Sequence, residues 1–136
     1  RLILKSWLEI LKHSDLETLA WVSLPVAFGE KFLNQKEKIL DNIVHAMVKR
    51  NRKQSLIAHL EAMTGYPSLS QIVQNVHGPV LVLSGSDDLL VKESDAGELA
   101  MICNGRHNPF TGTGHSIPAE APELFTKTVL QFLDRT

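Results

Sequence analysis

The chain has 136 residues, of which 43% are hydrophobic and 21% charged, and its formal net charge is −1. This length and apolar content suffice for one ordinary domain with a core. The near-neutral charge gives no basis for binding nucleic acid or an anionic membrane, so neither partner is expected. A single cysteine, Cys103, excludes an internal disulfide and favours a cytoplasmic location.

The first part of the chain, residues 1–77, carries only helical patterns. An apolar stripe at helical spacing opens it, over Ile3, Trp7, Ile10 and Leu11. The residues at 14–17 form a capping-box pattern, which predicts the start of a helix that ends near Pro25. A similar pattern at 34–37 predicts the cap of another helix, and Asn51 that of the next. The helical rhythm is already running at the first residue, without an initiator Met, so we expect a fragment of a longer protein.

The second part, residues 78–136, alternates strand and helix. The run at 80–83 is apolar throughout, which predicts a strand covered on both faces, as in a parallel sheet. A helix is predicted over 93–102 and a weaker strand over 106–111, and Pro122 starts the last helix. Two parallel strands alone do not make a stable sheet. We therefore expect further strands in a missing N-terminal half.

Polar side chains follow both predicted strands. Asp88 stands beyond the first strand, and His115 follows Thr111-Gly112-Thr113-Gly114 beyond the second. Ligands of α/β sheets bind beyond the carboxyl ends of parallel strands, so we expect the two side chains to meet there. A histidine can move a proton near neutral pH, and a carboxylate behind it fixes its tautomer. The sequence thus predicts two members of a nucleophile–His–Asp triad, but it contains no Gly-x-Ser-x-Gly motif for the third.

Three segments carry a resemblance to a known family. The segment 80–88 resembles the strand and acid loop of the α/β-hydrolase family, whose acid often stands third after a glycine. This resemblance selects Asp88 over Asp87. The segment 110–115 resembles the catalytic-histidine loop of that family, and 120–125 resembles the helix start that often follows it.

Residues 1–77 are similar to the helical cap of enol-lactonase-like and esterase-like members. The resemblance implies an α/β fold in which this cap precedes residues 78–136, the C-terminal strand–helix–strand–helix part of the hydrolase core, with two parallel strands and crossover helices. It implies a hydrolase without cofactor that cleaves a carboxylic ester, a lactone or a related bond in a small molecule. The catalytic residues in this chain would be Asp88 and His115. The nucleophile (Ser, Asp or Cys) would lie outside it, so the fragment alone is expected to be inactive.

Other functions remain open at this point. The chain fits a non-catalytic interaction module, or a pseudoenzyme that keeps the acid–histidine pair as structure. Asp87 and Asp88 could instead hold Mg²⁺, although no third carboxylate stands nearby. The remaining histidines form no cluster at ligand spacing with Cys103 or with carboxylates, so no metal is expected. The basic run at 49–53 fits a solvated corner between helices better than a helix–turn–helix DNA reader.

The expected partners follow from the same observations. They are a small-molecule substrate, the missing N-terminal half, and a second copy of the chain bound through an exposed sheet edge. Large apolar residues in the helical part fit either the cap core or a substrate pocket, namely Trp7, Trp21, Phe28, Phe32 and Met47.

Overall fold

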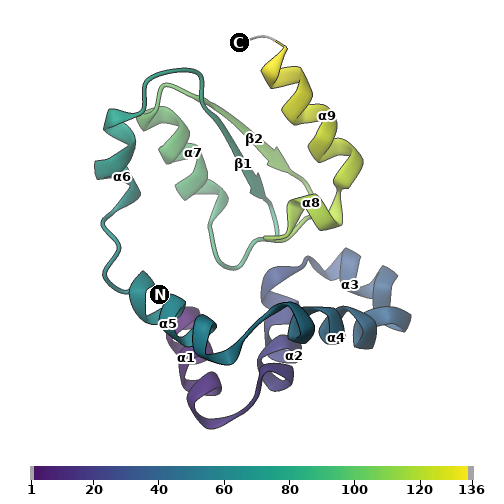
Figure 1. Cartoon of the computed structure of the whole chain (residues 1–136). Helices are drawn as coiled ribbons and strands as arrows, with labels where there is room; N and C mark the ends of the chain where they lie inside the picture. Colours follow the sequence, from purple (N-terminus) through teal and green to yellow (C-terminus); the bar gives the residue numbers. More distant parts are fainter. Residues whose placement is uncertain (1, 135–136) are drawn as a thin grey trace. The chain divides into compact units, whose positions relative to one another are not determined.

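The computed structural model describes residues 2–134 (Figure 1). The chain divides into two compact units, the first comprising Arg1–Pro25 and Leu33–Tyr66, and the second Val26–Phe32 and Pro67–Thr136. This division does not coincide with the predicted boundary at residue 77. Residues beyond 66 belong with the second unit because the short helices there pack against a helix of that unit.

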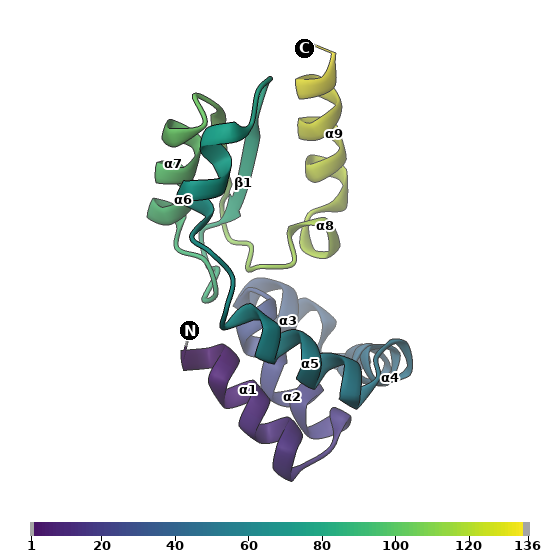
Figure 2. The same cartoon turned by 60° about the vertical axis from the view of Figure 1, so that its left-hand side comes forward.

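The first unit is built from helices. They are α1 (Leu2–His13), most of α2 (Leu16–Ala27), the end of α3 (Glu30–Lys36), the 3₁₀ turn η1 (Glu37–Ile39), α4 (Leu40–Arg50) and α5 (Lys53–Met63). Helices α1 and α5 pack side by side (Figures 1 and 2). The core of the unit is formed by Leu11, Leu19 and Leu60, against which the predicted stripe residues Trp7 and Ile10 pack. Three of the four predicted stripe residues of α1 thus belong to this core, and the fourth, Ile3, is not part of the cluster.

The predicted helix ends in this unit were less accurate. The cap of α2 is Asp15, whose Oδ1 accepts a hydrogen bond from the N–H of Thr18 at 2.8 Å, so the helix begins one residue later than the capping-box pattern indicates. Helix α2 ends at Ala27, two residues beyond Pro25, where the end was predicted. Pro25 is tolerated in this last turn, where its missing N–H removes one hydrogen bond of the helix. Asn34 lies inside α3, and Asn51 caps the end of α4 by donating to the carbonyl of Met47 at 2.7 Å.

The second unit contains a parallel sheet of two strands, β1 (Leu81–Gly85) and β2 (Arg106–Phe110), with Leu81 opposite Arg106 and Gly85 opposite Phe110. Helix α7 (Glu93–Ile102) connects the strands and packs on both of them. It is also contacted by α6 (Leu69–Ile72) and by the 3₁₀ turn η2 (Val73–Asn75). The predicted fold class, two parallel strands with a crossover helix, is confirmed.

The chain continues through α8 (Ile117–Glu120) into α9 (Pro122–Leu133). Helices α7 and α9 lie on opposite sides of the sheet (Figures 1 and 2). A cavity of about 80 Å³ separates α9 from the strands, and no residue of α9 is fully buried. In the described part of the chain, no helix combines the length and the apolar content needed to cross a membrane.

Candidate active site

The acid predicted from the sequence lies in the loop after β1. The strand ends at Gly85, and the N–H of Asp88 donates a hydrogen bond to the carbonyl of Gly85 at 3.4 Å. The N–H of Asp87 donates to the carbonyl of Thr113 at 2.9 Å, which joins this loop to the loop after β2. Both loops follow the carboxyl ends of the parallel strands, as predicted from the sequence.

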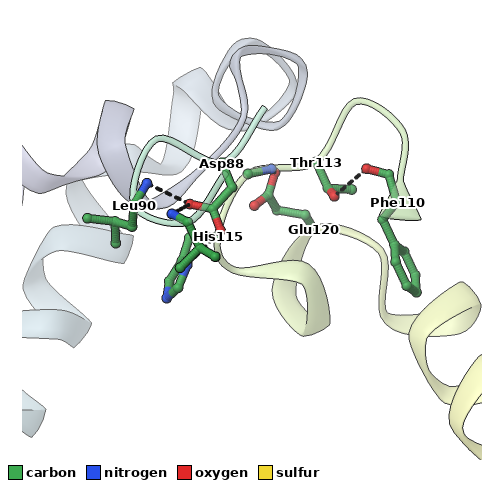
Figure 3. Close-up of polar contacts among 8 residues, drawn as sticks. Asp88, Leu90, Phe110, Thr113, His115 and Glu120 are labelled. Carbon is green, nitrogen blue, oxygen red and sulfur yellow. Dashed lines mark hydrogen bonds and ion pairs between the residues drawn. The ribbon is translucent and has the colours of Figure 1, made fainter. Parts of the chain in front are cut away.

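The two oxygens of the Asp88 carboxylate have different partners (Figure 3). Oδ1 accepts hydrogen bonds from the backbone N–H groups of Leu90 at 2.7 Å and Val91 at 3.1 Å. Oδ2 lies 2.8 Å from Nδ1 of His115. The Asp88 side chain is only 5% exposed. The carboxylate is thus fixed by two amides and turned toward the imidazole.

His115 is held by a loop with several backbone anchors. Oγ1 of the buried Thr113 donates to the carbonyl of Phe110 at 3.0 Å, and the N–H of Ser86 donates to the same carbonyl at 3.0 Å. The N–H of Gly112 donates to Oγ of Ser86 at 2.8 Å. These contacts place the histidine loop against the acid loop, so the meeting of Asp88 and His115 follows from the packing of two loop backbones.

Two glycines permit this geometry for different reasons. Gly112 has φ +69°, in the left-handed region that favours glycine. Gly114 has no such φ. It is required by close packing, since a Cβ at Gly114 would run into the backbone of Phe28 and Gly29.

The arrangement has defined proton chemistry. An ionised carboxylate can only accept hydrogen bonds, so the proton between Oδ2 and Nδ1 belongs to Nδ1 of His115. In the neutral imidazole this leaves Nε2 unprotonated and able to accept a proton. No side chain or backbone group that the structure describes hydrogen-bonds to Nε2, and the His115 side chain is 47% exposed. The structure thus brings Asp88 and His115 into contact, as expected, and leaves the other side of the imidazole exposed.

Other candidates from the sequence lie elsewhere. Asp87 is exposed and accepts a hydrogen bond from Oγ of Ser86, not from a histidine. His107 bonds through Nε2 to Oγ of Ser84 at 2.8 Å, within the sheet. Among residues 2–134 no three His, Cys, Asp or Glu side chains gather as metal ligands would. The magnesium hypothesis therefore has no support in the described residues.

The large apolar residues have separate roles. Trp7 packs into the core of the first unit. Trp21 is 40% exposed and borders a surface hollow of about 360 Å³ in that unit. Phe28 and Phe32 stack with their ring centroids 4.9 Å apart. The segment that contains these two rings, 26–32, belongs to the same compact unit as Asp88 and His115.

Sequence reasoning missed two residues that shape the site. Ser86 links the acid and histidine loops through its hydroxyl, and Glu120 accepts hydrogen bonds from the N–H groups of Gly29 and Gly114, each at 2.9 Å. Neither residue carries a local signal of these contacts. Gly29 is 91 positions from Glu120 in the chain, a separation that no pattern in the sequence bridges.

Comparison with known proteins gives structural matches only. No protein-family model matches the chain, and no curated protein sequence does either. The enol-lactonase from Burkholderia xenovorans LB400 superimposes with a TM-score of 0.83 at 25% identity, over 95% of this chain and 49% of that one. MGS-M2, an alpha/beta hydrolase enzyme from a Medee basin deep-sea metagenome library, gives 0.84 at 20% identity, over 98% and 50%. A thermophilic esterase from Thermogutta terrifontis gives 0.83 at 18% identity, over 97% and 48%.

The matches cover nearly all of this chain but only part of each solved structure. The chain spans about half the length of each of these structures, while nearly all of its own residues are superimposed. The helical part and the two-stranded part are therefore both included in the likeness. The chain has the fold of a C-terminal portion of an α/β-hydrolase, as the resemblance in its sequence implied.

Proposed function

We propose that this chain supplies the base and the acid of a hydrolase whose nucleophile lies outside the 136 residues. The observation that carries the proposal is the 2.8 Å contact between Asp88 Oδ2 and His115 Nδ1, with Nε2 open. In this role Asp88 is the orienting acid and His115 is first a general base and then a general acid.

The reaction runs in two halves. For a serine or cysteine nucleophile, Nε2 of His115 takes the proton of the hydroxyl or thiol as its oxygen or sulfur bonds to the acyl carbon. The imidazolium, stabilised by Asp88, gives this proton to the leaving oxygen as the ester or lactone bond breaks. In the second half Nε2 takes a proton from a water molecule as the water oxygen attacks the acyl carbon. His115 then gives this proton to the nucleophile as the bond between the nucleophile and the acyl carbon breaks. The carboxylic acid is released, the protein is regenerated, and the proposed cycle requires no cofactor.

The solved structures with this fold indicate a class of substrate. The solved structures with this fold include an enol-lactonase and an esterase, both named for cleavage of an acyl–oxygen bond. We accordingly propose a small carboxylic ester or lactone as the substrate.

The test uses the longer protein that we propose contains this chain. Turnover of activated esters and small lactones is measured for the wild type and for His115→Ala and Asp88→Asn. We expect kcat to fall by about 10⁴-fold in both variants, because each removes a member of the proton relay. His59→Ala, an exposed histidine on α5, is the matched control and should retain full turnover. Activity that survives His115→Ala would refute the proposal.

A further inference from the structure

The chain segments around His115 are anchored on both sides. On one side, the N–H of Ser116 donates to the carbonyl of Ala27 at 3.0 Å. On the other side, the N–H of Gly114 donates to Oε2 of Glu120 at 2.9 Å. The backbone N–H groups of the residues before and after His115 are therefore both hydrogen-bonded. The acceptor is a backbone carbonyl for Ser116 and the Glu120 side chain for Gly114.

Glu120 also reaches the segment at 26–32. Its Oε2 accepts a second hydrogen bond, from the N–H of Gly29, at 2.9 Å. One oxygen thus joins Gly114, directly before the histidine, to Gly29, two residues beyond Ala27. The four-residue helix α8 makes this possible, because it turns the chain so that Glu120 faces back toward the loop that precedes it (Figure 3).

The two carboxylate oxygens of Glu120 differ in their hydrogen bonding. Oε1 is buried and has no hydrogen-bond partner in the described part of the chain. Leaving a buried acceptor unpaired costs about 1–3 kcal/mol, and more for a charged group. The two hydrogen bonds that Oε2 accepts offset this cost. A charged acceptor binds amide N–H groups more strongly than a neutral one.

We propose that Glu120 is a positioning residue for His115. Its carboxylate holds the amide of Gly114 against the segment at 26–32 and thereby aims the imidazole at Oδ2 of Asp88. Glu120 does not touch the reacting atoms and exchanges no proton with them. This inference rests on the proposed function, because it assigns Glu120 to the placement of the proposed base.

The experiment reads the tautomer of His115 in the 136-residue chain. Two-bond ¹H–¹⁵N spectra of the neutral imidazole report which nitrogen carries the proton. The wild type should hold it on Nδ1, and Glu120→Ala should shift it toward Nε2, because the ring no longer faces Asp88. Glu120→Gln should keep the wild-type tautomer, since its carbonyl oxygen can accept the same two hydrogen bonds. Glu123→Gln, on the exposed first turn of α9, is the matched control and should change nothing.

The outcomes separate this inference from the proposed function. A wild-type proton on Nε2 would overturn the acid–base pair itself. A wild-type proton on Nδ1 that stays there in folded Glu120→Ala would overturn only the role of Glu120. If Glu120→Ala does not fold, Glu120→Asp decides, because it keeps a carboxylate but draws it back by one methylene group from the amides of Gly29 and Gly114. Retention of the wild-type tautomer in that variant would also refute the positioning role.

Discussion

At the scale of single residues, the site combines a contact that the sequence predicted with supports that it did not. The resemblance to α/β-hydrolases favours Asp88 over Asp87, and in the structure Asp88, not Asp87, contacts His115. That prediction succeeded because strand ends and short loops fix local positions. Glu120 could not be found in this way, since its partner Gly29 is distant in the chain and the contact depends on tertiary packing.

The contact between the two loops depends on the absence of a side chain at Gly85. A Cβ there would meet the carbonyl oxygens of Thr113 and Gly114. We expect Gly85→Ala to lower the free energy of unfolding by about 1–3 kcal/mol, because the added methyl group overpacks two backbones. Denaturant unfolding of the chain measures this loss. Gly65→Ala is the control, because the nearest atom to its Cβ would lie at 3.7 Å, an ordinary contact; an equal loss in both variants would contradict the explanation.

At the scale of elements, the strongest local patterns were the most reliable. Helix α7 has the predicted bounds, and Pro122 opens α9 as expected. The predicted caps were less accurate, because a polar residue between two helices can cap either one: Asn51 caps the end of α4 and not the start of α5. Helix α3 was not predicted, since its seven residues carry little apolar periodicity. Sequence patterns thus predicted the order of the elements in residues 78–136 better than the helix boundaries before them.

The cap of α2 has a predictable pH dependence. Hydrogen bonds from Thr18, first that of its backbone N–H, hold the pKa of the exposed Asp15 below its ordinary value of 3.8. Because the carboxyl has a lower pKa in the folded chain, its contribution to stability is present above the ordinary value. The contribution is lost as the pH falls through the folded-state pKa.

Asp15→Asn provides the test, because asparagine also caps helices but does not titrate in this range. We expect the Tm of the wild type, measured by circular dichroism, to fall relative to that of Asp15→Asn between about pH 7 and about pH 3. A difference in Tm that stays constant over this range would show that the ionised cap contributes nothing.

At the scale of the whole molecule, the second unit exposes apolar surface that a complete domain would cover. Large side chains of α9 are more than half exposed, Leu124 at 53% and Leu130 at 54%. The sheet has only two strands in the described part of the chain, so one edge of each strand is unpaired there. These features support the proposal that an N-terminal half of the same protein pairs with this one.

Without that half, the isolated chain should associate with itself. Sedimentation velocity over a range of concentrations should show species larger than a monomer, because exposed apolar patches and open strand edges favour association. Leu124→Glu combined with Leu130→Glu should reduce this association, if α9 forms part of the contact. A monomer at every concentration would contradict the expectation of an uncovered surface.

The central claim is that Asp88 and His115 serve a nucleophile outside these 136 residues. The most direct measurement is acid quenching of the longer protein during turnover of an activated acyl ester, followed by peptide mapping of the acylated residue. We predict that the acyl group is found outside residues 1–136 and that it forms far more slowly in His115→Ala. An acyl group attached within residues 1–136, or acylation at an unchanged rate in His115→Ala, would contradict the claim.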